Sequence, residues 1–358
     1  MSEGISLKKR LVLLGFVAVL ILAISLVAGC KKDKKEEETK ATKQTETTTV
    51  DPTIGKLRSL LTNEWIDEEL VLKRPVAIMF NNIYDGCPQN GIAKAGIIYE
   101  APVEGGICRL MGIFDDYSGL ERIGSIRSAR TYFPMFANEY DAIYMHHGYA
   151  YYAIDALEMV DDLDCGGGYG RVMAYRSDDR VAPHNSFTTP DMIDAGIEAC
   201  GYTRDYSETP TSHFYFSDEK TQINIVDGIT ANIIKPGYPV NYPSFEYDPA
   251  TKLYKRYQYG EPHIDELTGE QLTCKNIILQ YCNYSMYEDS PYLNINVSEG
   301  GDGMFFTNGM GESITWAKDY PWGTTHYYDM AGNEITLNTG KTWICICLTN
   351  NLGAIGVE

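Results

Sequence analysis

The residues best equipped for chemistry gather between positions 100 and 185. Arg127 and Arg130 lie three positions apart, so a helix beginning there would place both guanidinium groups on one face near its amino end. Guanidinium groups and the free N–H groups of a helix start bind carboxylates, phosphates or uronates. The sequence therefore predicts a ligand-binding set, the alternative being that each arginine pairs with a carboxylate such as Glu100 or Glu104. The candidate residues are Glu100, Glu104, Arg109, Arg127, Arg130, His184 and Asn185.

Glu100 and Glu104 could also form the acid and base of a glycosidase, which needs two carboxylates at a defined separation. In one extended strand, side chains four positions apart lie about 13 Å apart at ~3.3 Å per residue. That separation is too large for either glycosidase geometry, although a bend at Pro102 would shorten it. The spacing therefore argues against this chemistry.

Three histidines, His146, His147 and His184, raise the question of metal or nucleophilic chemistry. Adjacent histidines on a strand point to opposite faces and cannot both ligate one metal simply, which favours hydrogen-bonded histidines at a strand end. Ser186 with His184 lacks a nucleophile-elbow string. Cys108 or Cys165 with a histidine would suit acyl transfer, but nothing local separates these from structural thiols. We expect no metal and no cofactor.

Alternating strands and helices are expected to position these residues in the first half of the chain. Glu104-Gly105-Gly106 is a hairpin signal between two apolar runs, and Thr189-Pro190 is a cap and first residue for a helix. Pro134 fits only a first turn, so the helix around it begins as late as Thr131. Strands are expected at 75–80, 95–103, 109–114, 122–126 and 142–146, and helices within 128–140, 151–160 and 191–199, with a glycine-rich loop at 165–170.

After Gly201 the pattern changes to short strands separated by turn signals, which predicts an all-β half. The expected fold class is α+β, with an N-terminal layered α/β domain followed by a β-rich C-terminal domain. Strands are expected at 276–281, 293–297, 304–307, 313–316 and 341–348. The expected parts are a signal peptide at 1–29, a disordered tether at 30–63, and domains at 64–205 and 206–358.

The amino terminus has the features of a lipoprotein signal peptide. A basic start, Lys8 to Arg10, precedes an uncharged run that ends in Leu26-Val27-Ala28-Gly29-Cys30. This string resembles the bacterial lipobox, which implies a lipid on Cys30; an uncleaved membrane anchor is the alternative. The lysines and threonines that follow are typical of a solvated tether, or of contact with anionic headgroups.

Charge and cysteine content restrict the function further. The 358-residue chain has a formal net charge of −19, which argues against nucleic-acid binding. Residues 1–29 and 31–63 each carry +2, which leaves −23 on residues 64–358. Lipidation of Cys30 would leave eight cysteines, an even number that permits disulfides in an exported protein. Their apolar flanks favour buried free thiols.

Several strings in the chain resemble the YerB-like lipoproteins, a bacterial family of unknown function that is commonly lipid-anchored. The resemblance covers about residues 70–350 and implies an α/β domain, a β-rich domain and a membrane-anchored location, but no activity. One departure is Gly124-Ser125, where the family pattern has a proline after the glycine. The strings are Arg74-Pro75-Val76-Ala77-Ile78-Met79, Tyr99-Glu100, Glu104-Gly105-Gly106, Arg127-Ser128-Ala129-Arg130, Pro183-His184-Asn185, Pro262-His263-Ile264-Asp265 and Gly340-Lys341-Thr342-Trp343.

Three functions are consistent with these features. The first is a lipoprotein held on the outer face of the cytoplasmic membrane through Cys30, binding an anionic or glycan component of the cell envelope. The second is an envelope hydrolase or transferase with a cleft in the N-terminal domain. The third is an adaptor that binds a protein through an apolar patch of the β-rich half.

Overall fold

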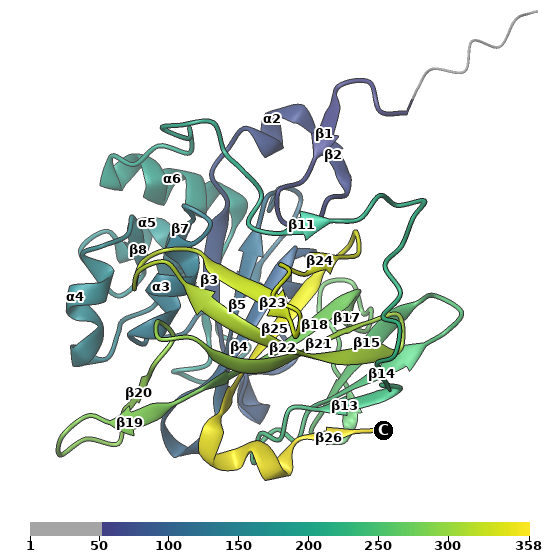
Figure 1. The fold of residues 1–358 in the computed structure, drawn as a ribbon. Helices are drawn as coiled ribbons and strands as arrows, with labels where there is room; N and C mark the ends of the chain where they lie inside the picture. The colour runs from purple at the N-terminus through teal and green to yellow at the C-terminus, as the bar shows by residue number, and fades with distance from the viewer. Residues whose placement is uncertain (1–51) are drawn as a thin grey trace, which may run out of the picture. The chain divides into compact units, whose positions relative to one another are not determined.

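An eleven-stranded mixed sheet at the centre of the molecule takes strands from both halves of the chain (Figure 1). The structure is a computed structural model that describes residues 52–358, which form one compact unit. The first half supplies β3 (Val76–Phe80), β4 (Ile97–Pro102), β5 (Cys108–Phe114), β7 (Ile143–His146) and β8 (Asp162–Asp164). The second half supplies β12 (Ile229–Thr230), β18 (Asn276–Cys282), β21 (Gly301–Thr307), β22 (Met310–Lys318), β23 (Thr325–Asp329) and β25 (Thr342–Leu348).

The two halves meet where β25 pairs with β4 in parallel, with Thr342 opposite Ile97 and Cys345 opposite Glu100. All of β4 and nearly all of β25 are buried. Strands covered on both faces form continuous apolar runs, as the sequence Trp343–Leu348 does. The sheet is therefore continuous across the predicted boundary at residue 205, and a division there stays a prediction.

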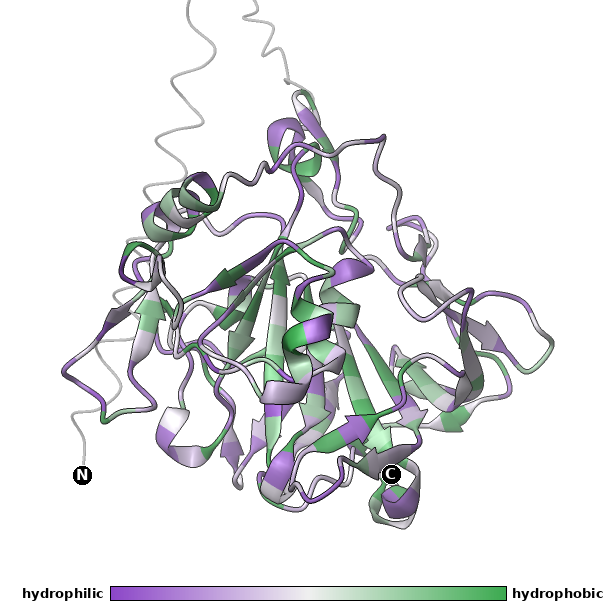
Figure 2. Cartoon of the chain, turned by 90° about the vertical axis from the view of Figure 1, so that its left-hand side faces the viewer, coloured by the Kyte–Doolittle hydropathy of each residue, from purple (hydrophilic) through white to green (hydrophobic). Residues whose placement is uncertain are grey.

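Each face of the sheet carries its own apolar core. Tyr99 of β4 packs on one face with Phe133 and Phe136 of helix α3. The neighbouring Ile98 lies in the other core, which includes Phe245 from a second sheet. Figure 2 shows hydrophobic residues on the central strands and hydrophilic residues in many of the connecting loops.

Smaller sheets surround the central one. The six-stranded sheet contains β13 (Ile233–Lys235), β14 (Ser244–Asp248), β15 (Leu253–Gln258), β16 (Glu261–Pro262), β17 (Thr273–Cys274) and β26 (Gly356–Val357). A three-stranded sheet contains β6 (Ile123–Gly124), β10 (Ser186–Thr188) and β9 (Tyr175–Arg176). Two-stranded ribbons pair β1 (Lys56–Arg58) with β2 (Trp65–Asp67), β11 (Tyr215–Phe216) with β24 (Thr336–Leu337), and β19 (Tyr284–Met286) with β20 (Leu293–Ile295).

The described chain is sheet-rich, and its helices are few and short. The α-helices are α2 (Glu68–Val71), α3 (Tyr132–Asn138), α4 (Ile154–Leu157), α5 (Gly170–Met173) and α6 (Pro190–Cys200). The 3₁₀ turns are η1 (Tyr84–Gly86), η2 (Ile92–Lys94), η3 (Glu104–Gly106), η4 (Tyr151–Ala153) and η5 (Thr349–Ala354). After residue 206 the only helical segment is η5, as the strand pattern predicts.

Local signals in the sequence place several elements correctly. The hairpin around Glu104–Gly106 is confirmed, because β4 and β5 pair antiparallel across it. Helix α3 begins at Tyr132, the residue after Thr131. Helix α6 begins at Pro190, and the Thr189 side chain accepts a hydrogen bond from the Met192 N–H at 3.3 Å.

The predicted lipidation at Cys30, the signal peptide and most of the tether lie outside the described residues. The other eight cysteines are free thiols, six of them buried. In the described range, no helix is both long enough and apolar enough to span a membrane.

Candidate anion-binding site

Two segments bring four of the predicted residues together. The turn between β4 and β5 presents Glu104, and β5 presents Arg109; the stretch between β6 and α3 presents Arg127 and Arg130. The turn closes tightly because Gly105 and Gly106 both adopt positive φ angles, which glycine reaches at little cost. Arg109 donates to the backbone carbonyl of Ser128, which ties the two segments to each other.

Glu104, Arg109 and Arg130 form a largely buried charged triad. The Arg130 guanidinium donates through Nε and Nη2 to both carboxylate oxygens of Glu104, with Nε 2.8 Å from Oε2. Arg109 Nη2 lies 3.7 Å from Glu104 Oε1. Arg109 and Arg130 are 4% and 5% exposed, so one carboxylate faces two buried cations. The alternative reading of the arginines, as ion-paired residues, therefore holds for these two.

Burial and neighbouring charge shift the pKa values of Glu104 and Arg109. Burial alone would raise the pKa of Glu104, but the hydrogen bond and charge of Arg130 hold that pKa below its ordinary value. Burial and the nearby Arg130 lower the pKa of Arg109 to about 9. With a pKa near 9, Arg109 is protonated at neutral pH, and the triad sets two guanidinium groups against one carboxylate.

Arg127 differs because its charge is not balanced. Across residues 52–358, no carboxylate lies within ion-pair distance of it, and its only hydrogen bond runs from Nη1 to the Pro183 carbonyl at 3.2 Å. Its Nε is buried without a hydrogen-bond partner. Burial and the like charge of nearby Arg130 lower the pKa of the Arg127 guanidinium.

A second unbalanced arginine, Arg176, lies beside Arg127 and was not predicted. Its guanidinium donates to Asn185 Oδ1 at 3.0 Å and to His147 Nε2 at 2.9 Å, with no carboxylate partner in the described chain. The His147 backbone N–H donates to the Arg127 carbonyl. Arg176 comes from β9, whose pairing with β10 has no local signal in the sequence.

His184 and Asn185 belong to the same surface. His184 follows Pro183, the residue that Arg127 contacts, and its Nδ1 accepts from Asn81 Nδ2 at 2.8 Å. Burial and the charge of Arg127 lower the pKa of His184. Asn185 donates to the Ser177 carbonyl at 2.9 Å, so it supports the loop and orients Arg176. Arg127, Arg176, His147 and His184 together are called the arginine face below.

Glu100 lies elsewhere. Its side chain is fully buried against Arg256 of β15, with Oε2 2.6 Å from Arg256 Nη2. Asn241 and Trp343 also donate to it, at 3.0 and 3.1 Å. This ion pair joins the central sheet to the six-stranded sheet, so Glu100 has a structural role and is left out of the candidate site.

The nucleophiles considered from the sequence are poorly placed for catalysis. Arginine can only donate, so Arg176 fixes His147 Nε2 as an acceptor and puts the proton on Nδ1. His147 Nδ1 then donates to Ser186 Oγ at 2.7 Å and cannot take the serine proton. Burial raises the pKa of Cys108 and of Cys165 well above the ordinary thiol value. Within residues 52–358, no three His, Cys, Asp or Glu side chains gather to hold a metal ion.

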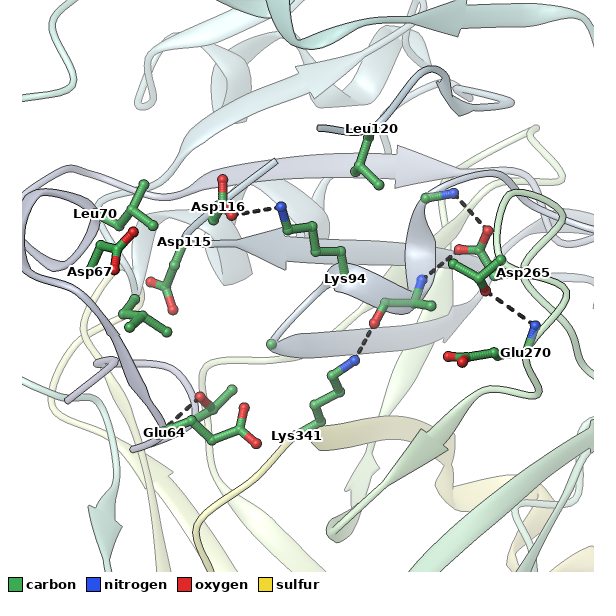
Figure 3. Close-up of a pocket in the computed structure, with 16 residues that line it drawn as sticks. Glu64, Asp67, Leu70, Lys94, Asp115, Asp116, Leu120, Asp265, Glu270 and Lys341 are labelled. Atoms are coloured by element: carbon green, nitrogen blue, oxygen red, sulfur yellow. Dashed lines mark hydrogen bonds and ion pairs between the residues drawn. The ribbon is translucent and has the colours of Figure 1, made fainter. Parts of the chain in front are cut away.

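A cavity of about 520 Å³ elsewhere in the described chain has a different character (Figure 3). Its charged lining is mostly acidic, and Lys94 is already paired with Asp116 at 2.6 Å. Burial raises the pKa of the lining residue Asp115 to about 6. None of the predicted site residues line this cavity. Its acidic lining disfavours the binding of anions. Its charged residues are Glu64, Asp67, Lys94, Asp115, Asp116, Asp265, Glu270 and Lys341.

Comparison with known proteins places the chain in a family. Models of the N-terminal and C-terminal domains of a protein family of unknown function, DUF3048, match residues 61–203 and 234–344. The chain is 31% identical over 302 residues to the "Putative lipoprotein YerB" of Bacillus subtilis (strain 168), covering 83% of this chain and 88% of that protein. The crystal structure of YerB from Bacillus subtilis matches with a TM-score of 0.73 and 27% identity, over 85% of this chain and all of that one. The chain therefore belongs to the YerB-like, DUF3048 family of two-domain proteins.

Proposed function

We propose that this protein is a lipid-anchored lipoprotein on the outer face of the cytoplasmic membrane that binds an anionic component of the cell envelope on its arginine face. The lipobox-like string ending in Cys30 and the name of the relative YerB support the anchor. The proposal keeps the division into a layered α/β domain at 64–205 and a β-rich domain at 206–358.

The observation on which the binding proposal depends is the unbalanced charge of Arg127. Most arginines of the described chain have a carboxylate partner. Four have none, and of these only Arg127 also has a buried nitrogen without a hydrogen-bond partner in the described chain; the other three are Arg171, Arg176 and Arg204. A half-buried guanidinium with a buried, unpartnered Nε is costly unless another group accepts its hydrogen bonds. A carboxylate or phosphate of a ligand would satisfy that donor and offset the charges of Arg127 and Arg176.

The enzymatic alternative has less support. A depressed pKa makes Glu104 a poor general acid, and Glu100 is sealed beneath Arg256. His147 has the wrong tautomer to activate Ser186. We therefore propose binding without catalysis.

A thermal-shift panel tests the proposal on the full-length chain in detergent. Glucuronate, inorganic phosphate and oligomeric glycerol phosphate are the anionic probes, and a neutral sugar is the comparison. We expect at least one anion to raise the Tm by preferential binding to the folded state, and Arg127→Ala to abolish that rise. If no anion raises the Tm, or if Arg127→Ala leaves the rise unchanged, the proposal is wrong.

A further inference from the structure

The ribbon formed by β19 and β20 has two chemically different faces. It belongs to neither large sheet and projects from them in Figure 1. Tyr284 lies opposite Ile295, Ser285 opposite Asn294, and Met286 opposite Leu293. Cross-strand partners share a face and successive residues alternate, so one face is apolar and the other is polar.

The polar face extends beyond the paired residues and contains only amides and hydroxyls. Its residues form part of the lining of a cavity of about 420 Å³, within the range of roughly 300–1,000 Å³ usual for small-molecule sites, and Met135, Ile295 and Val297 are among the apolar lining residues. No charged side chain lines this cavity, although the chain as a whole carries −19. Its polar residues from the ribbon and its flanks are Asn283, Ser285, Asn294, Asn296 and Ser298.

The hydrogen bonds of the three asparagines leave their amide nitrogens free. Asn283 Oδ1 accepts from Thr349 Oγ1 at 2.8 Å, and Asn294 Oδ1 accepts from the Tyr287 hydroxyl at 3.4 Å. Asn296 Oδ1 accepts from the backbone N–H of Ser298 at 3.1 Å. Within the described chain none of the three Nδ2 groups has an acceptor, so each carboxamide is held by its oxygen with its donors available.

We propose that this cavity binds a neutral sugar ring. Free amide donors suit the hydroxyl and ether oxygens of such a ligand, and the lack of charge in the lining matches an uncharged one. Tyr284 also lines the cavity and supplies an apolar ring surface for the C–H face of a sugar. The site shares no residue with the arginine face, so it does not rest on the proposed anion binding.

The test is a titration of the full-length chain in detergent with N,N′,N″,N‴-tetraacetylchitotetraose, a neutral oligosaccharide. The double variant Asn294→Asp, Asn296→Asp keeps both Oδ acceptors and their internal hydrogen bonds but removes the free donors. We expect it to weaken binding at least about tenfold, since two hydrogen bonds are lost. Asn232→Asp, an exposed site outside the ribbon, introduces the same kind of charge and is expected to leave the affinity unchanged.

Two results would overturn the inference. One is no saturable binding of the oligosaccharide by the unsubstituted chain at millimolar concentration. The other is equal affinity in the double variant and in Asn232→Asp. Arg127→Ala separates the two proposals, because it is expected to leave binding of the neutral sugar unchanged. If Arg127→Ala also abolishes binding of the sugar, the two sites are not separate.

Discussion

Arg127 and Arg130, three positions apart, differ in whether a carboxylate balances their charge. Arg130 forms a bidentate ion pair with Glu104, whereas Arg127 has no carboxylate partner in the described chain. The first is a structural ion pair that supports the β4–β5 turn. The second is the group from which we infer ligand binding, so substitutions at the two sites should affect different properties.

Glu104→Gln should destabilise the fold by about 3 kcal/mol, because it leaves Arg109 and Arg130 buried without a countercharge. The folded pKa of Glu104 is depressed, so its contribution is present above the unfolded pKa and is lost as the pH falls through the folded value. Urea unfolding at neutral pH and near pH 3 measures both effects. The difference between variant and unsubstituted chain should shrink in acid.

Glu121→Gln is the matched control, since Glu121 is exposed and forms no ion pair among the described residues. It should change the free energy of unfolding by less than about 0.5 kcal/mol. Equal destabilisation by the two variants would show that the triad does not depend on the carboxylate.

Binding of glucuronate should strengthen as the pH falls from 7.5 to 5.5. His184 is neutral at pH 7 because burial and Arg127 depress its pKa below the ordinary value. Protonation adds a positive charge beside Arg127, while the carboxylate of the probe stays ionised in this range. We expect a gain of about threefold, the size of a partly exposed charge interaction. A titration series at several pH values measures it, and His184→Asn should reduce the slope; a flat profile in the unsubstituted chain would contradict the role of His184.

The sequence predicted several residues of the arginine cluster, but not all of them. Arg127 and Arg130 could be found because their spacing is local, and Glu104 and Arg109 because they flank a turn. Arg176 could not be found, because its position depends on the pairing of β9 with β10. Glu100 could not be excluded, because its partner Arg256 is far away in the sequence.

The three-stranded sheet of β6, β10 and β9 is the element that assembles the arginine face. Gly124 of β6 lies opposite Phe187 of β10 with φ at +140°, a value that side chains rarely allow. A Cβ there would lie 2.9 Å from both the Phe187 ring and the Ser186 carbonyl oxygen. β6 therefore approaches β10 more closely than any residue with a side chain permits.

Gly124→Ala should destabilise the protein by about 1–3 kcal/mol through this overpacking. It should also weaken anion binding, because the register of β6 on β10 sets Arg127 against the loop at Pro183. Thermal unfolding and a glucuronate titration measure the two effects. Gly168→Ala, where a Cβ meets nothing within 4 Å, should do neither. Unchanged stability in Gly124→Ala would show that the close approach is not required.

Elements with their own local signals were the predictable ones. The β4–β5 hairpin and the cap of α6 follow from Gly105-Gly106 and Thr189-Pro190 alone. The parallel pairing of β25 with β4 joins residues more than 240 positions apart, and the apolar pattern of each strand does not specify its neighbour.

For the whole molecule, the shared sheet predicts a single cooperative unfolding transition. The β4–β25 pairing and the buried Glu100–Arg256 ion pair both cross between the two sequence halves. Calorimetry of the full-length chain should show one transition with matching calorimetric and van't Hoff enthalpies. Glu100→Gln should lower the Tm of that one transition, because Arg256 loses its countercharge. Two separate transitions, one for the unfolding of residues 64–205 and one for residues 206–358, would contradict the continuity of the sheet.

Calorimetric titration of the full-length chain with oligomeric glycerol phosphate tests whether Arg127 and Arg176 bind an anion. The matched control is Arg58→Ala, which removes the same charge from the β1–β2 ribbon. We predict that Arg127→Ala and Arg176→Ala each raise the Kd about tenfold or more, as expected for lost charge-assisted hydrogen bonds, while Arg58→Ala leaves the Kd near that of the unsubstituted chain. The same Kd for the Arg127→Ala, Arg176→Ala double variant and for Arg58→Ala would show that these two arginines do not bind the anion.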